Sequence, residues 1–305
     1  MSSNTTVAVC MGGPSAEREV SLNSGRAVAT GLREAGFSVV ELEIDQTLGA
    51  IPPEVDVVFP ALHGAYGEDG VIQAELERRG LPYVGTEAAH MMASFDKLQT
   101  KSLLVEAGLN TPAYAVVTDA AAPCPLPFPV VVKPPLQGSS VGVHKVWSEA
   151  EWGAALADVL SLDKNALVEA LVEGREMTVG VLSGEALPVV EIRAEGGTYD
   201  YAAKYLTGKT EYLVPAPVDD ALTRKMQRDA EACFALLGCR DLARIDFLVT
   251  PEGESTMLEC NSLPGFTATS LLPKAAAANG MSFATLCQTL VQGALEREVG
   301  ACEKT

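Results

Sequence analysis

Two alternating strands joined by a short turn constrain the fold of this chain more than any other feature. The strands are expected at residues 243–249 and 256–261, with a two-residue loop at 252–253. Alternate residues of a strand share a face, so Arg244 and Asp246 lie together on the first strand. Glu259 and Asn261 lie together on the second for the same reason. A two-residue loop sets the two carboxylates opposite each other and the arginine opposite the asparagine.

This pairing predicts a metal site. Opposed side chains begin about 5 Å apart, and two carboxylates at that distance repel each other unless a cation lies between them. Asp246, Glu259 and Asn261 supply only oxygen ligands, which suit Mg²⁺ and its usual phosphate partners. The alternative interpretation is a solvated outer face, since alternating acids are common on strands.

One lysine is a candidate phosphate ligand, and a second lies in a long polar segment. Lys133 ends an apolar run and precedes the Gly/Ser-rich segment 137–142, whose backbone N–H groups could supply further donors. The alternative for this lysine is an aliphatic stem lying along apolar surface with its ammonium in water. Lys204 lies in the polar segment 195–215, and a segment that long without clear structure is either an active-site lid or disordered.

Strands and helices alternate along the chain in three units, which predicts an α/β and α+β fold. The first unit has strands at 6–11, 39–44 and 55–62 and helices at 17–35 and 70–79, a parallel βαβ arrangement. The second has helices within 88–107 and strands at 116–117, 129–133 and 142–146. The third has strands at 177–182 and 188–192, a helix at 219–237, the hairpin and two Ala-rich helices.

Charge and cysteine content exclude several classes of protein. The chain carries 40 acidic and 22 basic side chains, a formal net charge of −18, which disfavours nucleic acid and anionic membranes as partners. Seven scattered cysteines without a Cys-x-x-Cys pair argue against a disulfide framework or a zinc ribbon. No basic residue precedes Arg18, and no apolar run approaches the roughly 18 residues of a membrane span. We therefore expect a cytoplasmic protein.

Three catalytic motifs fail on inspection. Gly208-Lys209-Thr210 ends like a phosphate-binding loop, but Ala203 stands where its first glycine is required. The segment 138–142 matches G-x-S-x-G without the strand, helix and downstream histidine of a serine hydrolase. Ser94 and Lys97 match S-x-x-K, yet the partner motifs of the penicillin-binding enzymes are missing.

Six blocks in a fixed order give the chain a family resemblance. They are GGPSAEREVSLNSG at 12–25, HGAYGEDG at 63–70, KPPLQGSSVG at 133–142, YDYAAKY at 199–205, RID at 244–246 and ECNSLPG at 259–265. Together they resemble the D-alanine–D-alanine ligases of the ATP-grasp superfamily. The resemblance extends from Val7 to the C-terminal helices.

The resemblance implies a three-domain ATP-grasp fold. An N-terminal parallel βαβ (pre-ATP-grasp) domain at 1–93 would hold the first substrate and a homodimer contact. A central subdomain at 94–175 and a C-terminal domain at 176–305, with a lid loop and the metal site, would enclose ATP. The carboxylate of one D-alanine would be phosphorylated, and the amine of a second would attack the acyl phosphate. The product would be D-alanyl-D-alanine for peptidoglycan precursors.

The resemblance also assigns residues by position. Two Mg²⁺ ions, replaceable by Mn²⁺, would be held by Asp246, Glu259 and Asn261. ATP would contact Lys97, Lys133, Ser140 and Lys204, with its adenosine in a pocket of Glu169, Leu171, Val172 and Glu176. Arg244 would stabilise the oxyanion of the tetrahedral intermediate. The ammonium of the first D-alanine would bind Glu17, which with Ser139 and Tyr205 would hold the lid closed. Other substrate contacts would be His63, Gly265, Ser270 and Leu271.

Departures from the family pattern and rival interpretations remain. Ala170 stands where a lysine is often found, Leu171 where an aromatic residue is, and Gln137 where an acidic one is commoner. Outside its block, His63 would be assigned to the core. A depsipeptide ligase that joins D-alanine to D-lactate is a close rival, and Tyr205 argues against it. A catalytically silent nucleotide-binding protein is a second rival, and the intact metal-site residues argue against it.

Overall fold

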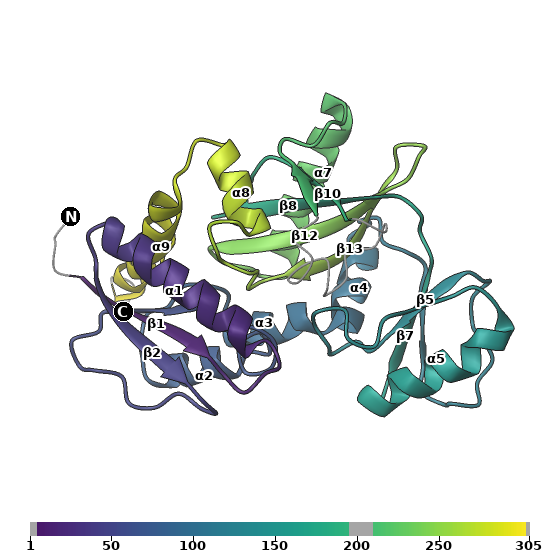
Figure 1. Ribbon diagram of the computed structural model, residues 1–305, viewed down its shortest axis with the longest axis horizontal. Coiled ribbons are helices and arrows are strands. Elements are labelled where there is room, and N and C mark those ends of the chain that lie inside the picture. Colours follow the sequence, from purple (N-terminus) through teal and green to yellow (C-terminus); the bar gives the residue numbers. More distant parts are fainter. Residues whose placement is uncertain (1–4, 195–209, 303–305) are drawn as a thin grey trace.

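Three β-sheets organise the protein, one in each of three packed units (Figure 1). The computed structural model describes residues 5–194 and 210–302. The N-terminal sheet is parallel and the other two are antiparallel, so the expected α/β and α+β class is confirmed. No described helix is both long enough and apolar enough to cross a membrane.

The N-terminal unit is the expected parallel βαβ arrangement. Its strands are β1 (Thr6–Gly12), β2 (Ser38–Ile44) and β3 (Val57–Pro60), in the order β2-β1-β3. Helix α1 (Arg18–Glu34) connects β1 to β2, and helix α2 (Val71–Arg78) follows β3. Gly36 ends α1 as expected: its φ of +91° turns the chain, and the Phe37 N–H then reaches the Leu32 carbonyl at 3.0 Å.

Two short helices lead into the central unit. They are α3 (Ala88–Phe95) and α4 (Lys97–Glu106), and the side chain of Asp96 between them accepts the Leu98 N–H at 2.8 Å. The central strands are β4 (Tyr114–Val117), β5 (Val130–Lys133), β6 (His144–Val146) and β7 (Ala166–Ala170), in the order β4-β7-β5-β6. Helix α5 (Glu149–Leu162) packs on this sheet. Neither α5 nor β7 was predicted.

The C-terminal unit contains the largest sheet. Its elements are β8 (Arg175–Leu182), β9 (Glu185–Ala186), β10 (Val190–Arg193), β11 (Glu211–Leu213), α7 (Asp220–Leu236), β12 (Leu242–Val249), β13 (Ser255–Asn261), α8 (Leu271–Ala278) and α9 (Phe283–Cys302). The strand order is β11-β10-β8-β12-β13, with β9 beside β8. Met177, Val179 and Val181 of β8 face α7, whereas Gly180 faces Leu272 of α8.

Helix α9 returns to the N-terminal unit. Its residues Leu286 and Leu290 share one hydrophobic core with Val28 and Leu32 of α1. Figure 1 shows α9 beside α1, across the molecule from the central sheet. The predicted domain boundaries stay a prediction, and this core joins the first predicted domain to the third.

The polar residues of the hairpin pair as expected, although its turn and the register near that turn differ from the prediction. Asp246 faces Glu259 and Arg244 faces Asn261. The turn, however, is not the expected two-residue loop, because Thr250 pairs with Glu254 and Gly253 takes a φ of +85°. A β-bulge between Asp246 and Phe247 shifts the register by one residue. The bulge compensates for the longer turn and restores the predicted pairing at the polar end.

Candidate active site

A cavity of about 930 Å³ lies where the three units meet. All predicted site residues within the described part of the chain line it: Glu17, His63, Lys97, Lys133, Ser139, Ser140, Glu169, Leu171, Val172, Glu176, Arg244, Asp246, Glu259, Asn261, Gly265, Ser270 and Leu271. Lys204 and Tyr205 lie outside the described residues. This size and this mixture of apolar and polar walls are typical of a small-molecule site.

Lysines form one wall of the cavity. Lys133 ends β5, and its ammonium lies 2.5 Å from the Glu169 carboxylate on β7. Lys101 of α4 pairs with the same carboxylate and donates to Thr111 Oγ1 at 2.6 Å. Burial alone would raise the pKa of Glu169, but the two ammonium groups outweigh it and lower that pKa. Glu169, predicted to line the adenosine pocket, is thus also the carboxylate that both lysines share.

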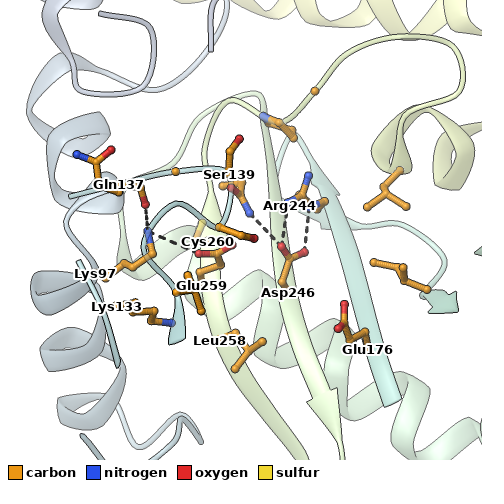
Figure 2. A pocket seen from close by; sticks show the side chains of 18 of the residues that line it. Lys97, Lys133, Gln137, Ser139, Glu176, Arg244, Asp246, Leu258, Glu259 and Cys260 are labelled. Atoms are coloured by element: carbon orange, nitrogen blue, oxygen red, sulfur yellow. Dashed lines mark hydrogen bonds and ion pairs between the residues drawn. The ribbon is translucent and has the colours of Figure 1, made fainter. Parts of the chain in front are cut away.

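Lys97 connects the lysine wall to the opposite one. Its ammonium donates to the Gln137 carbonyl at 2.7 Å and lies 3.7 Å from the Glu259 carboxylate (Figure 2). Burial lowers the pKa of Lys97, although Glu259 acts in the other direction. The lysine at the start of α4 therefore bridges the Gly/Ser loop and the metal-site strand.

The carboxylate wall centres on Asp246 of β12. Arg244 donates to it through Nε at 2.9 Å and Nη2 at 2.8 Å (Figure 2). Asn261 Nδ2 donates to it at 3.1 Å. Thr178 Oγ1 on the neighbouring strand β8 adds a fourth hydrogen bond at 2.6 Å. A carboxylate has about four acceptor positions, so this set engages all of them.

The donor atoms of this wall fit a hard divalent cation. Asp246 and Glu259 face each other across β12 and β13, with the Asn261 amide two residues further along. Within the described ranges no group of three or more His, Cys, Asp or Glu side chains could hold a metal, so the candidate set is two carboxylates and an amide. Oxygen donors of this kind suit Mg²⁺ or Mn²⁺ more than softer metals. Coordination by Asp246 requires at least one of its present donors to move.

The N-terminal unit and the Gly/Ser loop meet at the cavity. The Ser139 hydroxyl donates to the Glu17 carboxylate beside the start of α1. Ser139 and Ser140 have φ values of +51° and +60°, which are unusual for residues other than glycine. The structure thus brings together Glu17 and Ser139, two of the three residues predicted to hold the lid.

Further polar groups reach the cavity from the loop after β3, from α1 and from the start of α8. His63 is buried, with Nε2 3.0 Å from the Ser24 hydroxyl and Nδ1 3.6 Å from the Glu68 carboxylate. Ser270 is the N-cap residue of α8, and its hydroxyl accepts the Thr267 N–H at 3.0 Å. The free N–H groups of a helix start favour a carboxylate.

Apolar walls line the other end of the cavity. Leu171 and Val172 follow β7, while Leu248 and Leu258 project from the C-terminal sheet. The Leu171 N–H already donates to the Pro129 carbonyl at 3.1 Å. A base held here would therefore be recognised by other backbone groups of this segment.

Sequence reasoning missed several residues of this site. Thr178 is the one polar side chain within residues 177–182 of β8, and that interruption of an apolar run could have identified it. Lys101 follows Lys97 by four residues, which places both on one helix face. Ser24, which contacts His63, lies inside the first family block and carried no further signal.

A cavity between two antiparallel sheets, with lysines on one wall and carboxylates on the other, is the architecture of an ATP-grasp enzyme. Residues 103–292 match the family model described as D-ala D-ala ligase C-terminus, and residues 49–86 match D-ala D-ala ligase N-terminus. The chain belongs to the D-alanine–D-alanine ligase family.

Individual relatives agree with this membership. A D-alanine–D-alanine ligase of Aquifex aeolicus is 44% identical over 290 residues, covering 93% of this chain and 99% of the relative. That of Methylacidiphilum infernorum is 41% identical over 288 residues, covering 94% of each. The crystal structure of the Bacillus anthracis ligase complexed with ATP is 29% identical, with a TM-score of 0.86 over 97% of this chain and 99% of that one.

Proposed function

We propose that the protein ligates two D-alanines to D-alanyl-D-alanine at the expense of ATP, through an acyl phosphate, for peptidoglycan precursor synthesis. The observation that carries this proposal is the convergence of all described candidate residues on one cavity. Family membership supports it, and the ATP complex of the related structure supports ATP as the nucleotide.

The lysine wall is proposed to hold the phosphates. Lys97 and Lys133 reach the cavity from α4 and β5, and Ser140 offers a hydroxyl and a backbone N–H from the Gly/Ser loop. Phosphoryl transfer requires little covalent chemistry from a protein, so positive charge at the transferring group and precise positioning supply most of the catalysis. Lys204 is proposed to add a further contact from the polar segment.

The carboxylate wall is proposed to hold two Mg²⁺ ions, or Mn²⁺ in their place. Asp246, Glu259 and Asn261 are the ligands that its donor chemistry favours. When bound, the metal ions neutralise phosphate charge and orient the transferred group. The chain's own part is to hold both carboxylates in register, with Thr178 and Arg244 fixing the orientation of Asp246.

The two amino acids are proposed to bind beside Arg244. Glu17 would take the ammonium of the first D-alanine near His63, and Tyr205 would help to close the lid. Arg244 would stabilise the oxyanion that forms when the second amine attacks the acyl phosphate. Ser270 and Leu271 would receive the carboxylate of the second D-alanine at the start of α8, and Gly265 would be a further substrate contact.

The proposal also covers the location of the enzyme in the cell, its oligomeric state and its division into domains. The enzyme is proposed to act in the cytoplasm, where ATP and the amino acids are available. A homodimer through the N-terminal domain is proposed from the family resemblance. With domain boundaries proposed after residues 93 and 175, the nucleotide would lie between the second and third domains.

A coupled assay tests the proposal. The purified protein, Mg-ATP and D-alanine should release phosphate and form D-alanyl-D-alanine in equal amounts. The same assay with D-lactate added tests the depsipeptide rival. Phosphate release that depends on D-lactate would replace the dipeptide ligase by that rival, and no release under either condition would favour a silent nucleotide-binding protein.

A further inference from the structure

Two buried lysines share one buried carboxylate beneath the cavity, and the proposed chemistry uses only one of them. Lys101 and Lys133 pair with different oxygens of Glu169. Their exposed fractions are 1% for Lys101, 2% for Glu169 and 8% for Lys133. Glu169 and Lys133 line the cavity, whereas Lys101 lies behind them. Lysine is almost never buried this deeply without a partner, so its presence here needs a reason.

Lys101 is held firmly in this position. Thr111 Oγ1 accepts from its ammonium at 2.6 Å and donates to the Met257 carbonyl at 2.9 Å. This chain of hydrogen bonds fastens α4 to β13, the strand that carries Glu259. Burial lowers the pKa of Lys101 to about 8, which leaves the group largely charged at neutral pH.

The charges explain why two lysines are present. If Glu169 faced Lys133 alone, the buried pair would be neutral and would attract a phosphate only weakly. The second lysine leaves one positive charge in excess within the group of three. Because Lys133 is the lysine that reaches the cavity, the excess charge is available there to an anion.

We infer that Lys101 is a positioning residue for nucleotide binding: it neutralises Glu169, so that Lys133 keeps an uncompensated positive charge for an ATP phosphate. This inference rests on the proposed function, because it takes Lys133 as a phosphate contact. A purely structural lysine would only fill space and hold α4. The two roles differ in whether removing the charge of Glu169 restores the affinity that is lost with Lys101: a charge role predicts restoration, and a structural role does not.

The test is a double-mutant cycle on ligand affinity. Lys101→Met keeps the length of the side chain and removes its charge, and Glu169→Gln removes the charge that Lys101 neutralises. Dissociation constants for Mg-ATP and for adenosine are measured by calorimetry, with thermal unfolding as a check on folding. We expect Lys101→Met to weaken Mg-ATP binding about tenfold, and the double variant Lys101→Met/Glu169→Gln, whose group again carries one net positive charge, to bind Mg-ATP within about threefold of the unaltered protein. Adenosine, which lacks phosphate, should change less than about threefold in both.

Each outcome decides a different question. Failure of the unaltered protein to bind Mg-ATP would contradict the proposed function itself. A loss of Mg-ATP affinity in Lys101→Met that the double variant does not restore, or an equal loss for adenosine, would overturn the inference alone. If Lys101→Met does not fold, the Glu169→Gln variant alone tests the inference, through its affinities for adenosine and Mg-ATP. The ratio of the adenosine to the Mg-ATP dissociation constant should then stay constant or rise, and a fall would overturn the inference.

Discussion

Arg244 and Asp246, two residues apart on β12, form a two-point ion pair at 2.9 and 2.8 Å on the face that lines the cavity. Arg244 is the proposed oxyanion ligand and Asp246 a proposed metal ligand. Thr178 and Asn261 complete the hydrogen bonds to the same carboxylate. A metal at Asp246 must therefore take the place of one of these donors, so metal binding and the position of Arg244 are coupled.

Replacing Asp246 should abolish catalysis and metal binding together. Asp246→Asn keeps the shape of the side chain but removes its charge, and we expect turnover to fall at least about 10³-fold. Loss of Mn²⁺ affinity should be visible by electron paramagnetic resonance. Glu252→Gln, on the exposed turn of the same hairpin, is the matched control and should retain both properties. Near-normal turnover in Asp246→Asn would remove the basis for the metal site.

The hydrogen bond between Ser139 and Glu17 should support catalysis more than folding. A hydrogen bond to a charged group contributes about 1.5–3 kcal/mol, so Ser139→Ala should lower kcat/KM at least about tenfold. The melting temperature should change little, because the bond connects the surface Gly/Ser loop to α1. Ser139→Gly relieves the positive φ but also lacks the hydroxyl, and it should be equally impaired. A fully active Ser139→Gly would assign the effect to loop geometry.

Two glycines should respond to alanine in opposite directions. A methyl group at Gly174 would lie 2.5 Å from the Val249 carbonyl oxygen, so Gly174→Ala should destabilise the protein by about 1–3 kcal/mol. Gly153 lies on the exposed side of α5 with open space around it, and Gly153→Ala should stabilise by about 0.4–1 kcal/mol. Urea unfolding measures both. Equal effects would mean that the close approach at Gly174 is easily relieved.

The Glu191 carboxylate should make the free energy of unfolding depend on pH. Arg175 binds it at 2.8 and 2.7 Å, and these hydrogen bonds lower the pKa of Glu191 below its value of 4.5 in the unfolded chain. A lowered carboxyl pKa stabilises the folded protein above pH 4.5 and loses this effect as the pH falls through the folded-state value. Glu191→Gln should therefore be destabilising at pH 7.

Unfolding in urea between pH 7 and pH 3 measures this dependence. The gap in unfolding free energy between the unaltered protein and Glu191→Gln should narrow as the pH falls below 4.5. Glu211→Gln is the control, because this exposed residue lies 3.7 Å from Arg193 and should have little effect at any pH. A gap that stays constant across the range would show that the charge of Glu191 is not responsible.

The polar face of the hairpin was predictable, but its backbone was not. The pairing of Asp246 with Glu259 follows from strand alternation and a short loop. The actual turn carries one more residue, and only the bulge after Asp246 restores the pairing. The predicted register at the site was correct because the longer turn and the bulge cancel each other, and the sequence shows neither of them.

Other parts of the structure depend on burial, which a sequence does not display. Lys101 looks like any solvated helical lysine until α4 is packed against β7. Helix α5 was missed although Trp152, Leu156 and Val159 already mark a buried helix face. The shared core of α9 and α1 depends on contacts between the two ends of the chain, which no local pattern reveals.

Oxygen transfer from D-alanine to phosphate tests the central claim most directly. The protein is incubated with Mg-ATP and D-alanine carrying ¹⁸O in both carboxylate oxygens, and the products are analysed by mass spectrometry. The carboxylate of the first D-alanine attacks ATP, and the amine of the second then displaces phosphate from the acyl phosphate. This route predicts one ¹⁸O in each phosphate released. Three ¹⁸O atoms should remain in each dipeptide, one in the peptide carbonyl and two in the terminal carboxylate. Unlabelled phosphate together with a dipeptide retaining three ¹⁸O atoms, or ¹⁸O appearing in AMP, would contradict an acyl phosphate formed in this cavity.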